Sequence, residues 1–283
     1  VAFAPDGKTL ATAGADGTAR FWDVMSGREI SIFVRYPVPL CTVAFSGDGN
    51  TLALCTGDYK LQLWDRIGKR MKASLPANGQ VFAAAFSPDG DTFAFGSGKA
   101  IKFWSLGRME ELGSLAGFAA SSLLFSPDGK TLISIGDNDP RLWSTAPKPK
   151  IEILPGHTDG VYSVAFSPDN KILATGSGEY LQPIRASEVK LWDVAAQREI
   201  ETLPPETGTI YSVVFSPDGK TLAVCGTGTE FELWDVAEGS RKTARRCEWN
   251  VHALTFSRNG EMLASGGWSN EMLGTLRLWN VLR

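Results

Sequence analysis

Histidine is the side chain of this 283-residue chain best suited to acid–base chemistry near neutral pH, because its ordinary pKa lies close to 6.5. The chain has two, His157 and His252, which lie far apart in the sequence. A histidine that activates a nucleophile needs a serine or cysteine partner, and no GxSxG motif is present. We therefore expect no catalytic residues, no enzymatic activity and a structural role for His157.

Cysteine and aspartate are the remaining candidates for metal or redox chemistry. Asp137-Asn138-Asp139 offers oxygen ligands, but Pro140 follows and no further acidic residue has the spacing of a calcium loop, so we expect a turn. The cysteines lack the CxxC spacing of a zinc site or a disulfide framework. We expect no metal and no cofactor, and unpaired thiols favour a cytoplasmic location. The four cysteines are Cys41, Cys55, Cys225 and Cys247.

Composition argues against nucleic acid and membrane partners. The formal net charge is −3 and the sequence pI is about 5.6, so the chain has no general attraction to nucleic acid. The strongest basic cluster is interpreted as a solvated sheet edge, and no run of 18 apolar residues predicts a membrane span. This cluster consists of Arg241, Lys242, Arg245 and Arg246.

The elements that would position any site come from a pattern repeated seven times, an FSPDG-like turn followed by a tryptophan. Its shared Phe recurs at steps of 42, 41, 39, 41, 49 and 41 residues, and such a period indicates one supersecondary unit used repeatedly. The seven Phe/Trp pairs are Phe3/Trp22, Phe45/Trp64, Phe86/Trp104, Phe125/Trp143, Phe166/Trp192, Phe215/Trp234 and Phe256/Trp279.

Each copy holds short apolar stretches separated by turn residues, which predicts a four-stranded antiparallel sheet. In the fifth copy we expect strands within 160–167, 171–175, 189–193 and 198–203. Such a sheet cannot bury both faces alone, so stacking of seven sheets, with the tryptophans packed between them, is predicted. The expected fold is all-β, one seven-bladed β-propeller domain over residues 1–283. Its blades are predicted at 1–34, 41–75, 81–115, 120–154, 161–203, 210–246 and 251–283.

These motifs resemble the WD40 repeat family along essentially the whole chain. Trp-Asp stands at Trp22, Trp64, Trp192 and Trp234, and Gly-His once, at Gly156-His157. The frequent FSPDGKTLA-like wording resembles bacterial members of the family.

The resemblance also implies a polar network in each blade and a closed last blade. The family links the Gly-His histidine to a Ser or Thr, a turn Asp and the Trp. No copy here has both His and Asp at the expected offsets, so we expect the network to be broken in every blade. Blade seven is expected to lack its outer strand, which the family commonly supplies from upstream of the first repeat. We therefore expect the chain to be part of a longer protein.

Departures from the repeat predict where a partner binds. The Phe-to-Trp spacing is 18 or 19 in five copies but 26 in the fifth and 23 in the seventh. The extra residues fall within 178–187 and 268–274, between strands two and three. That turn lies at the edge of the sheet where the first strand begins, here called the start edge. Residues four before the shared Phe lie there too. The candidate partner-binding residues are Tyr162, Tyr180, Arg185, Tyr211, His252, Trp268 and Met272.

The leading prediction is a non-catalytic scaffold that binds a protein or peptide at the start edge of blades five to seven. The alternative is a ligand- or peptide-sensing regulatory domain of a larger protein such as a kinase. A second alternative, that the candidate aromatics only pack the inserted loops down, stays open. The sequence leaves the oligomeric state undetermined.

Overall fold

The computed structural model describes residues 1–75, 77, 79, 81, 83–117, 119–136, 139–145, 151–178, 187–268 and 274–281, with backbone only at 268 and 274. The chain divides into two compact units, Val1–Phe125 and Ser126–Arg283. Within the described residues all regular structure is β-strand and no helix is present.

The strands are short, because each spans one apolar stretch between two turns. The first unit holds β1 (Ala2–Phe3), β2 (Thr9–Ala13), β3 (Thr18–Asp23), β4 (Glu29–Arg35), β5 (Leu40–Phe45), β6 (Thr51–Thr56), β7 (Leu61–Asp65), β8 (Arg70–Leu75), β9 (Ala84–Phe86), β10 (Thr92–Ser97), β11 (Ala100–Ser105), β12 (Glu110–Ala116) and β13 (Ser122–Phe125). The second unit holds β14 (Thr131–Ile135), β15 (Arg141–Ser144), β16 (Ile151–Ile153), β17 (Val161–Phe166), β18 (Ile172–Ser177), β19 (Glu188–Asp193), β20 (Arg198–Leu203), β21 (Ile210–Phe215), β22 (Thr221–Gly226), β23 (Glu230–Asp235), β24 (Ser240–Arg246), β25 (Asn250–Phe256), β26 (Met262–Trp268) and β27 (Gly274–Asn280).

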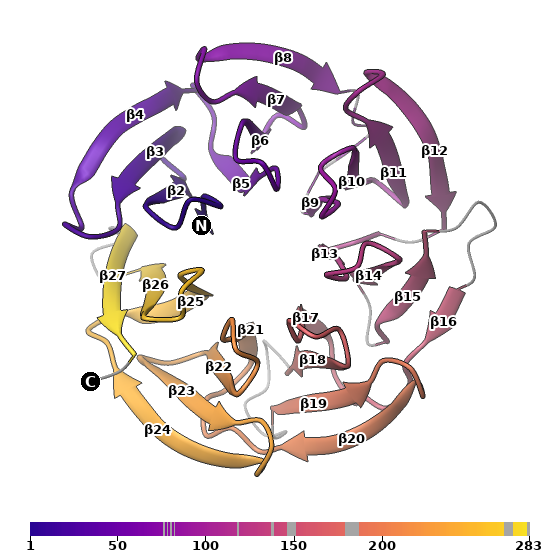
Figure 1. Cartoon of the computed structure of the whole chain (residues 1–283), viewed down its shortest axis with the longest axis vertical. Coiled ribbons are helices and arrows are strands. Elements are labelled where there is room, and N and C mark those ends of the chain that lie inside the picture. Colours follow the sequence, from indigo (N-terminus) through magenta and orange to yellow (C-terminus); the bar gives the residue numbers. More distant parts are fainter. Residues whose placement is uncertain are drawn as a thin grey trace. The chain divides into compact units, whose positions relative to one another are not determined.

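Successive strands pair with one another to form seven antiparallel sheets in chain order (Figure 1). Six sheets have four strands and the last has three, β25-β26-β27. This confirms the predicted class, a seven-bladed β-propeller whose last blade lacks a fourth strand among the described residues. The fifth copy confirms the predicted meander, with strands β17, β18, β19 and β20 in that order.

The repeated Ser-Pro-Asp turn fixes the register between the first two strands of a blade. In blade five the Ser167 hydroxyl donates to the Asp169 carboxylate (2.7 Å) and accepts the backbone N–H of Ile172 (2.9 Å). The hydrogen bonds from Ser167 and from the Lys171 backbone lower the pKa of Asp169. Asn170 adopts a φ of 61°, a left-handed conformation that Asn tolerates. These hydrogen bonds within the turn therefore close the hairpin locally.

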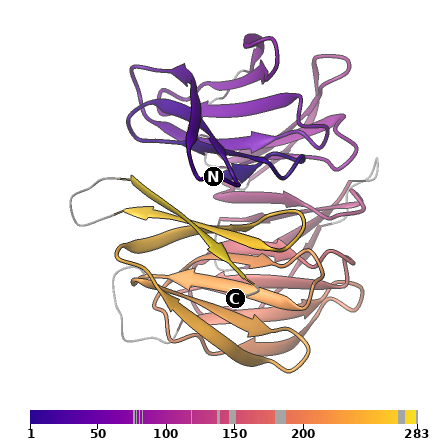
Figure 2. The same cartoon turned by 60° about the vertical axis from the view of Figure 1, so that its left-hand side comes forward.

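Buried apolar side chains fill the space between neighbouring blades. One cluster joins blade five to blade six through Leu191, Ile210 and Leu222, all at most 1% exposed. A second joins blade six to blade seven through Phe231 and Val251; Figure 2 shows these two sheets beside each other, in orange and yellow. Because each blade supplies one half of a shared core, a single blade would leave an apolar face in water.

The repeated tryptophans lie at these junctions, and most donate their indole N–H within their own blade. The acceptor is a second-strand hydroxyl in four blades, at distances of 2.6–2.9 Å. Blades two and six use a third-strand side chain instead, Gln62 or Glu232. The Trp104 N–H is buried without an acceptor among the described residues. The four hydroxyl pairs are Trp22–Thr12, Trp143–Ser134, Trp192–Thr175 and Trp279–Ser265.

Candidate functional site

A β-bulge interrupts the start of the first strand in four blades. In each, the register to the second strand shifts by one residue, so one residue of the first strand is extra. An extra residue is released from the regular ladder and its side chain is redirected, which is why bulges recur beside functional sites. The four bulge residues are Cys41, Tyr162, Tyr211 and His252.

Three of these bulge residues follow one another in blades five, six and seven, and they were predicted as partner-binding residues. The Tyr162 side chain is 41% exposed and its ring lies against Gly160. His252 is exposed and Tyr211 is half-buried. The structure therefore places three polar aromatic side chains at the start edge of consecutive blades, at the solvent boundary.

Tyr211 and His252 contact each other across two blades. Their ring centroids lie 4.7 Å apart and the ring planes are inclined by 16°, which is a stacked arrangement. Partial burial lowers the pKa of His252, so its imidazole is neutral at pH 7. The pair forms a flat platform with polar atoms at its margin, a surface of the kind that anchors interfaces.

The residues after the bulges of blades five and six fix the spacing of the platform. Ser163 accepts the backbone N–H of Val213 in the next blade (2.9 Å), and Ser212 accepts that of Leu254 (3.2 Å). These two hydrogen bonds tie β17 to β21 and β21 to β25 directly below the bulges. The platform is therefore held by hydrogen bonds between serine hydroxyls and the backbone of the next blade, in addition to its own stacking.

The other predicted site residues come from the two insertions. Tyr180, Arg185 and Met272 lie outside the described residues, so the structure does not place them. Trp268 is the last residue of β26 and pairs with Asn250 at the start of β25, but its side chain is not described. The insertions join β18 to β19 and β26 to β27, as the spacing predicts.

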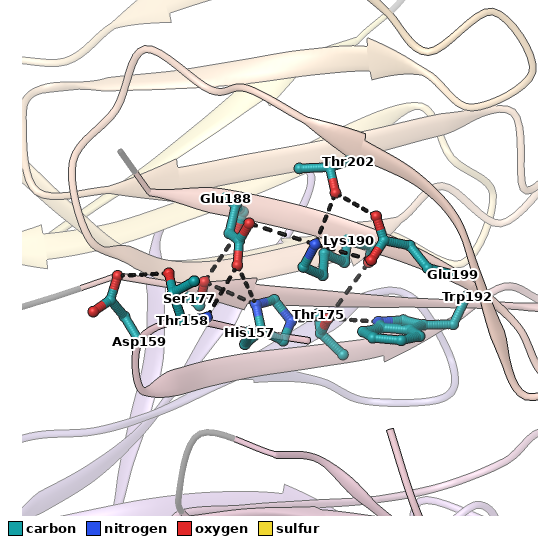
Figure 3. A network of polar contacts seen from close by, with 10 residues as sticks. All are labelled: His157, Thr158, Asp159, Thr175, Ser177, Glu188, Lys190, Trp192, Glu199 and Thr202. Atoms are coloured by element: carbon teal, nitrogen blue, oxygen red, sulfur yellow. Dashed lines mark hydrogen bonds and ion pairs between the residues drawn. The ribbon is translucent and has the colours of Figure 1, made fainter. Parts of the chain in front are cut away.

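His157 lies in a polar network within blade five, and here the sequence-based expectation is wrong (Figure 3). We expected the family's network to be broken in every blade. Instead, His157 contacts the hydroxyls of Ser177 (Nδ1, 2.9 Å) and Thr175 (Nε2, 2.6 Å), and Thr175 accepts the indole N–H of Trp192. Glu188, the first residue of β19, supplies the carboxylate 3.1 Å from His157 Nδ1.

The Glu188 carboxylate was missed because it follows the insertion and does not stand at the offset of the turn Asp. Its second oxygen lies 3.5 Å from the buried ammonium of Lys190, which also pairs with Glu199 (2.9 Å) and donates to Thr202 (3.0 Å). Burial lowers the pKa of His157, and the carboxylate of Glu188 opposes that shift without cancelling it. These groups satisfy one another, which fits a structural network better than a reactive site.

The Lys190–Glu199 pair belongs to a series that repeats between third and fourth strands. Arg20 pairs with Glu29 (2.7 Å) and Lys102 with Glu111 (3.0 Å) at the same place in blades one and three. Blade six reverses the charges: Glu232 stands on β23, and Arg241 of β24 lies 3.8 Å from it. In blade seven the corresponding Arg277 lies over the Trp279 ring, 4.4 Å from its centroid.

Part of the basic cluster of β24 is neutralised by these contacts. Arg241 forms an ion pair with Glu206 (2.7 Å) and Lys242 with Asp235 (2.9 Å). Among the described residues, no group of three or more His, Cys, Asp and Glu side chains is arranged to hold a metal ion. In the same part of the chain, no helix is long and apolar enough to cross a membrane.

Comparison with known protein families gives a result that agrees with the sheet topology and the repeat spacing. The profile of the family described as WD domain, G-beta repeat matches residues 1–23, 30–65, 69–105, 148–193, 197–235 and 242–280. These segments cover most of the chain, which therefore belongs to the WD40 repeat family.

Three curated relatives show more distant similarity. Protein tipD of Dictyostelium discoideum is 32% identical over 104 residues, 35% of this chain and 17% of the relative. The Periodic tryptophan protein 2 homolog of the same organism is 26% identical over 60% of this chain and 20% of its own length. Protein HIR1 of Yarrowia lipolytica is 26% identical over 62% of this chain and 17% of its own length.

The chain thus spans a fifth or less of the length of these relatives. The relatives are eukaryotic, so the suggested resemblance to bacterial members finds no support in them.

Proposed function

We propose that this protein is a non-catalytic interaction module that binds a protein or peptide at the start edge of blades five to seven. The observation that carries the proposal is the stacked, solvent-accessible pair of Tyr211 and His252, with the exposed Tyr162 one blade away. Membership of a family built on repeated interaction surfaces supports this class of function. A cytoplasmic location stays a prediction.

The chemistry of the described residues favours binding over catalysis. His157, Glu188, Lys190 and Glu199 form a group of polar side chains in blade five, and their polar atoms contact one another. A sensing pocket or an active site needs polar groups that converge on a ligand. The aromatic bulge residues, in contrast, present their surfaces outward.

Site-specific photo-crosslinking tests this proposal with the full chain in cells. A photoreactive phenylalanine analogue is placed at position 162, and a matched chain carries it in place of Met25, which is 88% exposed at a turn of blade one. We expect the chain labelled at position 162 to crosslink to a defined protein, and the chain labelled at position 25 to give no such product.

The partner found in this way is then titrated against purified variants. Tyr211→Ala combined with His252→Ala is expected to weaken binding about 30-fold or more, since anchor residues contribute about 2 kcal/mol or more. Met25→Ala should bind like the unaltered chain. Equal affinity of the double variant, with unchanged thermal stability in every chain, would show that the platform is not the binding surface.

A further inference from the structure

The fourth bulge residue, Cys41, differs from the other three because a second thiol lies opposite it. The register of β5 and β6 pairs Leu40 with Thr56 and Thr42 with Cys55, so Cys41 is the extra residue. In a bulge, two residues of one strand oppose a single residue of the other. Cys41 and Thr42 therefore both face Cys55.

Strand geometry brings the two cysteines within reach of a disulfide. Opposed residues of antiparallel strands have Cα atoms about 4.5–5.5 Å apart. Disulfides span Cα separations of about 4.4–6.8 Å, and Cys41 is the chain neighbour of Thr42, the residue paired with Cys55. Burial raises the pKa of Cys55 to about 12, and the Cys41 thiol adds to that shift.

The two thiols have different access to solvent. Cys41 is exposed, whereas Cys55 is fully buried and donates its S–H to the backbone carbonyl of Val81 (3.1 Å). A dissolved disulfide can therefore reach Cys41 but not Cys55. This asymmetry gives each thiol a separate role. Cys41 reacts with the dissolved disulfide, and Cys55 then attacks the mixed disulfide on Cys41.

We propose that Cys41 and Cys55 form a reversible disulfide by exchange with a low-molecular-weight disulfide. The Cys41 thiolate attacks one sulfur of that disulfide, forms a mixed disulfide and expels a first small thiolate, which takes up a proton. Cys55 then attacks the Cys41 sulfur, its proton passes to the second departing small thiolate, and the protein disulfide remains. The protein loses two electrons and two protons, and the small disulfide becomes two thiols.

Oxidation changes a contact between blades two and three. The Cys55 S–H disappears, so the Val81 carbonyl, which precedes β9, loses that hydrogen-bond donor. The bulge is at the same time covalently fixed to β6. The proposed disulfide therefore couples the redox state of the surroundings to the start edge of blade two and to the segment that leads into blade three.

The chain contains a matched internal control. Cys225 stands in blade six at the repeat position of Cys55, ten residues after the shared Phe, and its pKa is raised by burial and, to a smaller extent, by the Cys247 thiol. Both of these thiols are buried, at 0% and 4% exposure. With neither thiol accessible, the first exchange step cannot start in the folded chain.

The experiment incubates the reduced full chain with oxidised glutathione and follows intact mass and crosslinked peptides under non-reducing conditions. The expected product has lost two hydrogen atoms, contains a Cys41–Cys55 crosslink and returns to the starting mass with a reducing agent. Cys41→Ser should give no product. Cys55→Ser and Cys55→Ala should stop at one glutathione adduct on Cys41, and the Cys225→Ser, Cys247→Ser chain should behave like the unaltered one.

The rate of the second step gives an independent readout. Because the thiolate fraction of Cys55 rises tenfold per pH unit below its pKa, conversion of the adduct to the disulfide should accelerate about tenfold from pH 7 to pH 8. The proposal is overturned if the unaltered chain stops at the glutathione adduct at both pH values. A Cys225–Cys247 crosslink formed at the same rate would also overturn it.

Discussion

The hydroxyl of Thr175 connects two aromatic side chains, accepting from Trp192 Nε1 (2.8 Å) and contacting His157 Nε2 (2.6 Å). Thr175→Val removes both contacts and leaves the Trp192 indole N–H and the Nε2 atom of His157 without these partners. We expect the free energy of unfolding to fall by about 2–4 kcal/mol. Thr12→Val in blade one removes only the contact to Trp22 (2.9 Å) and should cost about 1 kcal/mol. Urea titration measures both values, and equal losses would contradict the linked arrangement.

Burial of His157 predicts how stability depends on pH. The folded chain holds the pKa of His157 below its ordinary value, whereas the unfolded chain titrates near 6.5. The unfolded state therefore binds the extra proton first, and the contribution of His157 is present above pH 6.5 and lost as pH falls below it. The free energy of unfolding should decrease by up to about 1.4 kcal/mol per pH unit there.

Comparison with His157→Gln isolates this effect in urea titrations between pH 7.5 and 5.5. The variant should show a shallower decline than the unaltered chain, and His252→Gln, which changes a more exposed group, should keep most of the slope. Parallel curves for the unaltered chain and His157→Gln would show that His157 does not carry the dependence.

At single positions, the sequence predicted the structural role of a residue better than it predicted which side chains that residue contacts. The tryptophans between the blades and the Ser-Pro-Asp turns follow from residue types at a fixed period. The contact between His157 and Glu188 does not follow from that period, because Glu188 stands at a different position in the blade from the turn Asp that it replaces. The sequence does show an acidic residue, Glu188, four residues before Trp192 and directly after the insertion. Only the folded hairpin brings this position next to the histidine.

Between strands, the cations two residues before the tryptophans differ in burial and in number of partners. Lys190 has a side chain 9% exposed and contacts two carboxylates and a hydroxyl, whereas Lys102, 13% exposed, forms an ion pair with one carboxylate among the described residues, that of Glu111. We expect Lys190→Met to lower the free energy of unfolding by about 2–3 kcal/mol, because it leaves two carboxylates without their cation. Lys102→Met should lower it by about 0.5–1 kcal/mol. Urea titration of both variants measures the difference, and equal costs would contradict it.

The sequence predicted the strands of each blade but not the irregularities that shape the candidate site. Tyr162, Tyr211 and His252 were selected by residue type and distance from the shared Phe. That they stand on bulges depends on how first and second strands pair, and no residue in the motif encodes this locally. The same holds for Cys41, whose position opposite Cys55 emerges only from the shifted register.

Across the whole molecule, position within the sheet should govern amide hydrogen exchange. Second strands are paired on both sides and their apolar residues are essentially unexposed, as in Leu52–Cys55. We expect these strands to exchange most slowly in every blade and fourth strands most rapidly, because the latter are paired on one side only. Exchange followed by mass spectrometry measures this order.

The same rule predicts a difference between the third strands of blades six and seven. Among the described residues β27 pairs only with β26, whereas β23, the third strand of blade six, is flanked on both sides. Amides of β27 should therefore exchange faster than those of β23. Equal protection of the two strands would mean that β27 has a further partner in solution.

The bulges of blades five to seven have a consequence for how the proposed binding surface can change over evolutionary time. A side chain released from the ladder contributes little to strand pairing, and Cys, Tyr and His occupy equivalent bulges in one chain. Mutations at Tyr162, Tyr211 and His252 would alter the proposed binding surface while the hydrogen bonds of the surrounding ladder are kept. Specificity can diverge there without first passing through unstable intermediates.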